Sequence, residues 1–362
     1  MKKILLISNE VFPYRIGVYN DLFDRFAAHG YEFNVLCNKI NVVKYVPVRF
    51  PYKEISFNSR KYKSIIDQMN PSVVIIFLHL KDSVQIPVVL HCNRNKIPVV
   101  YWNKGLCDNG REFSKANPVW KRALYHWIHG RCDACITYTQ ACKSNYKESV
   151  WQRLFVAPNT VSFACVDKSK YNKAFVKAKY QIPADNKIVL FSGTVDKAFK
   201  RPELLLDALD GIDGVSLVFM GSCKDEVLLQ QIQEQSNAYY VGSLYGDDGY
   251  ELWSAADIIS IPGNLGLAAN EAMFWGCPVA IVKGVHPPEA YCVRDGYNGI
   301  IAKNDEDFKK RLAGLLKDDK KLNQMSENCL ATYKNEISMD KMSQGFLDAC
   351  DYAMKHVGVH SI

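Results

Sequence analysis

The stretch that decides the fold is DIISIPGNLGLAANEAMFWGCPVAIV, residues 257–282. Apolar runs at 258–262 and 278–282 have the length of buried strands. Between them a glycine-containing loop leads into a helix rich in small residues at 266–276. The stretch therefore predicts a strand, a tight loop, a short helix and a second strand, with one carboxylate, Glu271, inside the helix.

Strand-like and helix-like segments alternate along the whole chain of 362 residues. Strands are predicted at 3–8, 32–37, 72–78, 98–102, 134–138, 187–193, 215–221 and 238–242, and helices at 17–30, 117–130, 202–212, 225–235, 248–257 and 339–358. Near-continuous apolar strands between helices are typical of parallel sheets covered on both faces. We therefore predict an α/β fold of two doubly wound, Rossmann-like domains, a number that also suits the chain length.

The boundary between the two domains is predicted near residues 156–186. We expect an N-terminal acceptor-binding domain over 1–165 and a C-terminal nucleotide-sugar-binding domain over 166–340. The last segment, 341–362, is expected to form a helix that could cross back to the first domain.

Charge is distributed unevenly over the chain. Residues 1–180 carry a net charge of +16, and the remainder carries −9. A basic half suits nucleic acid, an anionic membrane surface or a phosphorylated substrate. The sequence contains no recognised nucleic-acid-binding motif, so we expect no nucleic-acid partner.

An aromatic stripe in the predicted helix 117–130 admits two interpretations. It either packs in the core, as one face of every helix of this fold must, or it docks on the headgroups of an anionic membrane. The stripe consists of Trp120, Leu124, Trp127 and Ile128, with Lys121, Arg122 and Arg131 nearby.

The sequence favours a cytoplasmic protein, either free or peripheral on the inner face of the membrane. Its first apolar stretch is too short for a signal peptide, and no segment has the roughly 20 apolar residues of a membrane span. Many of the 12 cysteines lie in apolar contexts, as free thiols do in a reducing compartment. Cys132 and Cys135 have a metal-like spacing without a second pair, so we expect no metal site.

Three loops of the second half follow strands and precede helices. Ligands of doubly wound sheets bind beyond the carboxyl ends of strands, where helix N-termini favour anions. The loops are therefore candidates for holding a diphosphate, although glycines at such loops often serve packing alone. Their candidate residues are Gly193, Thr194, Lys200, Arg201, Gly221, Ser222, Gly266, Leu267 and Ala268.

Four segments occur in an order that can be compared with known families. They are VAPNTV (156–161), SGTVDKAFKRPELLLDAL (192–209), NEAMFWGCPVAIVKG (270–284) and VRDGYNGII (293–301). In this order they resemble the linker, the diphosphate segment, the Glu-Ala-Met signature and the following Asp-Gly-x-x-Gly turn of retaining GT-B nucleotide-sugar glycosyltransferases, glycosyltransferase family 4. The resemblance covers roughly 155–301, and the first half matches more loosely, as expected of an acceptor-binding domain.

The resemblance implies transfer of a sugar, with retention of anomeric configuration, from a UDP- or GDP-sugar to a saccharide or lipid-diphosphate-linked saccharide. Surface polysaccharide or glycoconjugate synthesis is the implied role, with no cofactor and no metal ion. Glu271 would bind the ribose hydroxyls, because a carboxylate accepts two vicinal hydroxyl protons. Lys200 matches the diphosphate lysine and, with Arg201 and the helix N-terminus at 266–268, would stabilise the leaving group.

Three positions depart from the family pattern. Gly263 stands where a carboxylate usually contacts the transferred sugar, with Asn264 after it in place of the usual glycine. Thr194 stands where an arginine usually binds the diphosphate, a role that Arg201 could take over. These departures are compatible with nucleotide binding, but they leave the identity of the transferred sugar undetermined. Asn264 would better suit an N-acetylated or deoxygenated sugar.

The first half contributes a second set of candidates. His79, at the carboxyl end of strand 72–78, could face the cleft and hydrogen-bond the donor sugar. Arg15 and Gly17, in the loop after the first strand, could meet the donor phosphate or the acceptor. Asn103 and Lys104, after strand 98–102, could reach an acceptor phosphate.

Two alternative functions remain open at this point. A sugar-nucleotide epimerase of the same fold would convert the donor without an acceptor. A catalytically silent binding module, which Gly263 makes plausible, would bind a nucleotide without turnover.

Overall fold

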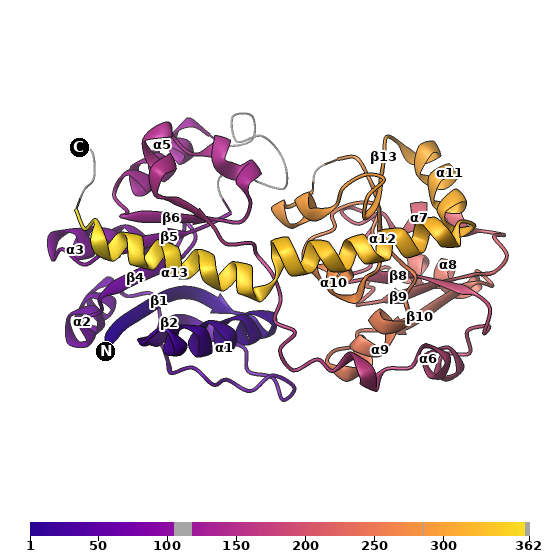
Figure 1. The fold of residues 1–362 in the computed structure, drawn as a ribbon, viewed down its shortest axis with the longest axis horizontal. Coiled ribbons are helices and arrows are strands. Elements are labelled where there is room, and N and C mark those ends of the chain that lie inside the picture. Colours follow the sequence, from indigo (N-terminus) through magenta and orange to yellow (C-terminus); the bar gives the residue numbers. More distant parts are fainter. Residues whose placement is uncertain (105–117, 285, 359–362) are drawn as a thin grey trace. The chain divides into compact units, whose positions relative to one another are not determined.

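The computed structural model describes residues 1–104, 118–284 and 286–358, and it divides into two compact units (Figure 1). Unit 1 comprises residues 1–164 and 338–362, and unit 2 comprises residues 165–337. The last four residues of the expected C-terminal helix lie outside the described residues. Each unit is built around one sheet of parallel strands, which confirms the predicted α/β fold of two Rossmann-like domains.

Unit 1 contains, in its described part, a seven-stranded parallel sheet in the order β3-β2-β1-β4-β5-β6-β7. The strands are β1 (Lys2–Val11), β2 (Tyr31–Ile40), β3 (Tyr52–Glu54), β4 (Val73–Phe77), β5 (Val99–Trp102), β6 (Ala134–Thr137) and β7 (Leu154–Val156). The helices are α1 (Pro13–Ala28), α2 (Ser59–Met69), α3 (Gln85–Arg94), α5 (Val119–Gly130) and α13 (Met339–Lys355). The strand order reverses between β1 and β4, so the loops after these strands flank the position where doubly wound sheets bind ligands.

Helix α1 begins four residues earlier than the sequence predicted. Pro13 is its first residue. Proline suits this position, because the N–H it lacks would have no partner within the helix and its fixed φ is helical. Arg15 and Gly17 therefore lie in the first turns of α1, and their predicted placement in a loop was wrong.

Helix α13 lies across the strands of unit 1, although it is encoded at the far end of the chain (Figure 1). Its apolar side chains join the same core as α1, and the ring of Phe346 meets that of Trp102 at 4.8 Å between centroids. Gly345 allows this approach, because a Cβ there would lie 2.3 Å from the carbonyl oxygen of Val156.

Unit 2 contains a six-stranded parallel sheet, within the described residues, in the order β10-β9-β8-β11-β12-β13. Its strands are β8 (Lys187–Ser192), β9 (Val215–Met220), β10 (Ala238–Gly242), β11 (Ile258–Ser260), β12 (Val279–Val282) and β13 (Gly299–Ala302). Its helices are α6 (Lys173–Lys179), α7 (Pro202–Leu209), α8 (Glu226–Glu234), α9 (Asp247–Ala255), α10 (Ala268–Trp275), α11 (Asp305–Leu316) and α12 (Asp319–Thr332). The order reverses between β8 and β11, so the loops after these two strands meet at the expected ligand position.

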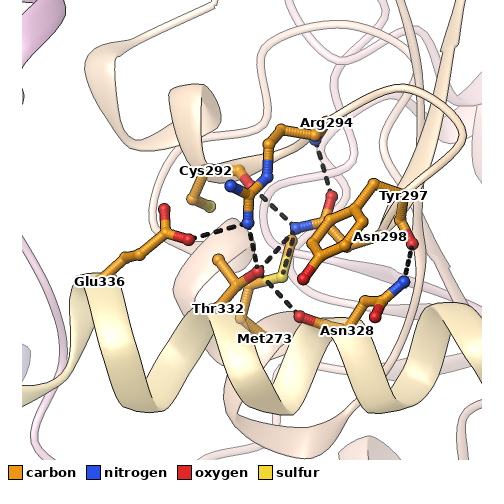
Figure 2. A network of polar contacts seen from close by, with 8 residues as sticks. All are labelled: Met273, Cys292, Arg294, Tyr297, Asn298, Asn328, Thr332 and Glu336. Atoms are coloured by element: carbon orange, nitrogen blue, oxygen red, sulfur yellow. Dashed lines mark hydrogen bonds and ion pairs between the residues drawn. The ribbon is translucent and has the colours of Figure 1, made fainter.

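A polar network around Asn298 anchors α10 to α12 (Figure 2). The fully buried Asn298 amide donates to the carbonyl of Cys292 at 2.9 Å and to Oγ1 of Thr332 at 3.1 Å. It also contacts the sulfur of Met273 at 3.5 Å, and its oxygen accepts from the backbone N–H of Arg294 at 2.7 Å. Because Met273 belongs to α10, this network holds the helix that carries Glu271.

We expect Asn298→Ala to lower the free energy of unfolding by about 1–3 kcal/mol, because it leaves buried donors and acceptors without partners. Asn328→Ala is the matched control, since it removes one exposed hydrogen bond, from its amide to the carbonyl of Tyr297. Denaturant unfolding of both variants measures the difference. Equal losses in the two would contradict the role given to Asn298.

Candidate functional site

The loops after β8 and β11 are joined through their backbones in unit 2. The N–H of Gly263 donates to the carbonyl of Lys200 at 3.0 Å, and that of Asn264 donates to the carbonyl of Phe199 at 2.8 Å. A Cβ on Gly263 would lie 2.1 Å from the Phe199 oxygen. The departure from the family pattern at Gly263 therefore has a steric cause, because this backbone pairing leaves no room for any side chain.

We expect Gly263→Ala to lower the melting temperature by several degrees, since the loop pairing must break or shift to admit the methyl group. Gly314→Ala is the control. It lies in α11 with nothing within 4 Å of the added carbon, so the change should be neutral or slightly stabilising. Thermal unfolding measures both, and a Gly263→Ala variant as stable as the control would refute the steric explanation.

Gly193 and Gly221 are required where the ends of β8 and β9 approach each other. Gly221 has a φ of +152°, and a Cβ there would lie 1.9 Å from the carbonyl oxygen of Gly193. Gly193 has a φ of +114°, and its absent Cβ leaves space for the ammonium of Lys200, which would lie 2.8 Å away. The adjoining side chains of Thr194 and Ser222 are exposed. The two glycines thus place a lysine ammonium at the carboxyl end of β8.

Lys200 and Glu271 form the electrostatic centre of this site. Burial raises the pKa of Glu271 from 4.5 to about 7, and the Lys200 ammonium acts against that rise. Burial lowers the pKa of Lys200, while the carboxylates of Glu271 and Asp196 act in the opposite direction. Burial therefore leaves both charged groups poorly solvated. A ligand that brings an anionic group to Lys200 and hydroxyl groups to Glu271 would compensate for this loss of solvation.

Helix α10 begins at Ala268, directly after the loop that carries Gly263. Its N-cap residue is Leu267, whose apolar side chain cannot cap the helix. Gly266 precedes it with a φ of +60°, which turns the chain into the helix. The N–H groups of Ala269 and Asn270 donate to the carbonyls of Gly266 and Leu267, so the first turn of α10 offers a ligand mainly the positive end of the helix dipole.

Arg201 is oriented by a residue that the sequence did not point to. Its Nη2 donates to Oδ2 of Asp305 at 2.6 Å, across 104 residues of sequence. Its backbone has a φ of 57°, the left-handed conformation, immediately before Pro202 begins α7. The guanidinium is therefore fixed by an acidic partner at the start of α11. Its predicted contact with a diphosphate stays a prediction.

In unit 1, Arg15 and His79 flank the reversal of strand order. His79 is exposed just after β4, where its backbone N–H donates to Oδ2 of Asp82 at 2.8 Å. Arg15 is buried in the first turn of α1, and its guanidinium lies 5.0 Å from the ring centroid of Phe77 in β4. Gly17 lets the segment that follows β7 approach α1, since its Cβ would lie 3.1 Å from that of Ser162.

Asn103 and Lys104 follow β5, as the sequence predicted, but the Asn103 amide is bound within unit 1. Its oxygen accepts from the Tyr146 hydroxyl at 2.6 Å, and its nitrogen lies 3.1 Å from Nε2 of His129. Burial lowers the pKa of His129 to about 3, so this imidazole is neutral and Nε2 accepts. Asn103 therefore holds its own loop in place, and contact with an acceptor stays a prediction. Lys104 is partly buried beside it.

Metal ligation and membrane spanning find no support in the described residues. No cluster of three or more His, Cys, Asp or Glu side chains is arranged there to hold a metal ion. Cys132 and Cys135 are both buried, and burial raises the pKa of each thiol above its ordinary value. Among the described helices, none combines the length and apolarity needed to cross a membrane.

Residues 172–330 match the family model described as "Glycosyl transferases group 1". The processive diacylglycerol beta-glucosyltransferase of Bacillus licheniformis is 27% identical over 220 residues, which are 59% of this chain and 56% of that protein. The chain thus spans just over half the length of this curated relative. The matched segment contains the loops after β8, β9 and β11 of unit 2.

Solved structures share the fold over nearly the whole chain. The Anabaena Alr3699/HepE structure with UDP has a TM-score of 0.75 at 15% identity, covering 97% of this chain and 100% of its own. A glycosyltransferase from Rickettsia africae has a TM-score of 0.78 at 13% identity, covering 98% and 99%. A UDP-GlcNAc 2-epimerase from Neisseria meningitidis is less similar, with a TM-score of 0.66 at 15% identity, covering 96% and 99%. These likenesses establish a GT-B-like fold.

Proposed function

We propose that the protein transfers a sugar from a nucleotide-diphosphate donor to a saccharide or lipid-linked saccharide, with retention of anomeric configuration, in the synthesis of a surface polysaccharide or glycoconjugate. The juxtaposition of Lys200 and Glu271 at the reversal of strand order in unit 2 carries the proposal. A buried cation and a carboxylate that act on each other electrostatically match the two polar parts of a nucleoside diphosphate, its phosphates and its ribose hydroxyls.

The donor lies on the loops of unit 2 in this proposal. Glu271 accepts hydrogen bonds from the two ribose hydroxyls, and the first turn of α10 faces the diphosphate. The same loops contribute Gly193, Thr194, Gly221, Ser222, Gly263, Asn264, Gly266, Leu267 and Ala268. Asn264 contacts the transferred sugar in place of the carboxylate that the loop pairing excludes at Gly263.

Catalysis consists of stabilising the departing diphosphate. As the bond from the anomeric carbon to the phosphate oxygen breaks, negative charge grows on the diphosphate. Lys200, the Arg201 guanidinium oriented by Asp305, and the N-terminus of α10 stabilise that charge. The acceptor hydroxyl attacks from the face that the diphosphate leaves and gives its proton to a diphosphate oxygen. No side chain is needed as a nucleophile.

Unit 1 supplies the acceptor side of the proposal. Arg15, Gly17 and Lys104 lie at the carboxyl ends of β1 and β5, and the exposed His79 contacts the donor sugar. Asn103 positions the loop that carries Lys104.

A screen of UDP-glucose, UDP-GlcNAc and GDP-mannose by thermal shift tests the proposal, because a ligand that binds the folded state raises its melting temperature. UDP-glucose comes first, because an Alr3699/HepE structure was solved with it. We expect one donor to stabilise the chain and to release its nucleotide only when an acceptor is added. NMR of the product then gives the anomeric configuration. A new sugar nucleotide formed without acceptor would instead show an epimerase, and binding without turnover a silent module.

We also propose that unit 1 reaches a lipid-linked acceptor at an anionic, cytoplasmic membrane surface. Two observations support this: the curated relative is named for diacylglycerol, and Trp120 at the start of α5 is 67% exposed. The predicted four-residue stripe does not form one free face, because Ile128 is fully buried and Trp127 lies under the Arg131 guanidinium at 4.0 Å. Flotation with anionic and neutral liposomes at low salt tests the proposal. Equal binding to both, or none, would contradict it.

A further inference from the structure

Arg15 is a buried cation surrounded by aromatic rings at the start of α1. The residue is 4% exposed. Its guanidinium carbon lies 4.7 Å from the ring centroid of Trp102, 5.0 Å from that of Phe77 and 5.2 Å from that of Tyr14. The rings hold the guanidinium plane in place and remove water from it.

This cation has no anionic partner within the described residues. Nη2 reaches the Tyr138 hydroxyl at 3.5 Å, whereas Nε and Nη1 have no hydrogen-bond partner there. The groups that act on it are the hydroxyls of Tyr138, Tyr14 and Tyr19, of which Tyr14 also hydrogen-bonds the guanidinium, and no carboxylate is among them. The indole N–H of Trp102 is also buried without a partner in that part of the chain. A buried charge is costly unless it is paired, so these donors require an acceptor from outside the described chain.

Asp82 and Asp21, two acidic side chains of unit 1, are engaged with other groups. Asp82 accepts from the backbone N–H of His79 at 2.8 Å. Asp21, further along α1, interacts with Ser162 and with the cations of Arg25 and Arg49. The positive end of the α1 dipole, which its N-cap residue Phe12 leaves without a side-chain hydrogen bond, adds to the attraction for an anion.

An exposed aromatic surface adjoins this cation. Phe12 and Tyr14 flank the start of α1, with ring centroids 6.3 Å apart and planes within 4° of each other. Phe12 is 44% exposed and Tyr14 is 40% exposed. Tyr14 thus belongs both to this surface and to the wall around Arg15. A ligand with one apolar ring face and one anionic group matches the pair.

We propose that Arg15 binds a carboxylate or phosphate carried by the acceptor saccharide, whose neighbouring sugar ring lies on Phe12 and Tyr14. A planar guanidinium suits both anions, because its fork of donors meets two oxygens at once. The inference rests on the proposed function only in assigning this anion to the acceptor. The acceptor is accordingly an acidic sugar or a sugar phosphate.

The test measures binding of glucuronate, glucose 6-phosphate and glucose to the full chain, with and without saturating UDP. Calorimetry gives the affinities, and tryptophan fluorescence reports on Trp102 next to Arg15. We expect one anionic sugar to bind at least 10-fold more tightly than glucose, and the preferred one distinguishes carboxylate from phosphate. Arg15→Gln should remove that preference and leave the affinity for UDP unchanged. Arg94→Gln, an exposed change of equal charge in α3, should alter neither.

The following results would overturn the inference. One is that the wild-type chain shows no preference for either anionic sugar over glucose. Another is that Arg15→Gln weakens UDP instead, which would assign Arg15 to the donor. If Arg15→Gln does not fold, Arg15→Lys serves instead, because it keeps the charge but lacks the planar fork of donors. We expect Arg15→Lys to lose part of the preference for the anionic sugar. An unchanged preference in this variant would contradict the inference. A chain that prefers an anionic sugar but binds no UDP or nucleotide sugar would refute the proposed function and leave this inference standing.

Discussion

Lys200→Ala is expected to lower turnover about 10²–10³-fold, the usual effect of removing one positioned group that stabilises developing negative charge. Its ammonium occupies the space that Gly193 leaves at the carboxyl end of β8. Because burial lowers the pKa of Lys200, the folded state disfavours this charge, and the variant should be as stable as the wild type. Steady-state kinetics with the donor found by screening, together with denaturant unfolding, measure the two effects separately.

Lys197→Ala is the matched control for this experiment. Lys197 lies in the same loop, is exposed, and pairs with Asp225 at 3.6 Å. Its loss removes an equal charge, so nearly wild-type turnover is expected. Adding Arg201→Ala to Lys200→Ala should lower turnover further without a comparable loss of stability. A Lys200→Ala variant with wild-type turnover would remove this lysine from the catalytic machinery.

Glu271→Gln is expected to weaken binding of free UDP or GDP by about 1–3 kcal/mol, because an amide replaces one of two hydroxyl acceptors with a donor. Titration calorimetry measures this. Glu234→Gln, an exposed change of the same kind in α8, is the control and should leave the affinity unchanged. Equal affinities in the wild type and Glu271→Gln would exclude Glu271 from the site.

The same substitution should make the unliganded protein more stable at pH 8. Folding raises the pKa of Glu271 from 4.5 to about 7, so the folded state binds the proton more tightly than the unfolded state. Wild-type stability from this group is therefore lost as the pH rises from about 4.5 to about 7, and none of that loss occurs with glutamine. The difference in unfolding midpoint should be absent below pH 4.5 and largest above pH 7. A constant difference across this range would contradict the shifted pKa.

Most of the fold follows from local sequence pattern. The strands of both sheets are runs of buried apolar residues, and glycines or prolines mark many of their ends, so alternation alone indicated two parallel sheets. Helix α8 was predicted within one residue at each end, at 225–235 against Glu226–Glu234. The short edge strands β3, β7 and β13, of three or four residues, were missed, because such short segments carry little periodicity.

The surroundings of each candidate side chain could not be predicted from the sequence to the same extent. The position of Glu271 followed from its motif, whereas the pairing of Arg201 with Asp305 joins residues 104 apart and depends on how α11 packs beside α7. The ring of aromatics around Arg15 comes from β4, β5 and α1, so it exists only once the strand order is known. The steric reason for Gly263 depends on backbone pairing between two loops, which no residue pattern encodes.

The placement of α13 in unit 1 has a consequence for biosynthesis. Unit 2 is one uninterrupted stretch of chain, whereas unit 1 needs both its first 164 residues and the helix that starts at Met339. On the ribosome, the apolar surface that meets Met342 and Phe346 stays uncovered until α13 has been synthesised. Unit 2 can therefore fold before α13 has been made, whereas unit 1 completes its core only after α13 has left the ribosome. This interval is when a chaperone would bind the exposed surface of the nascent protein.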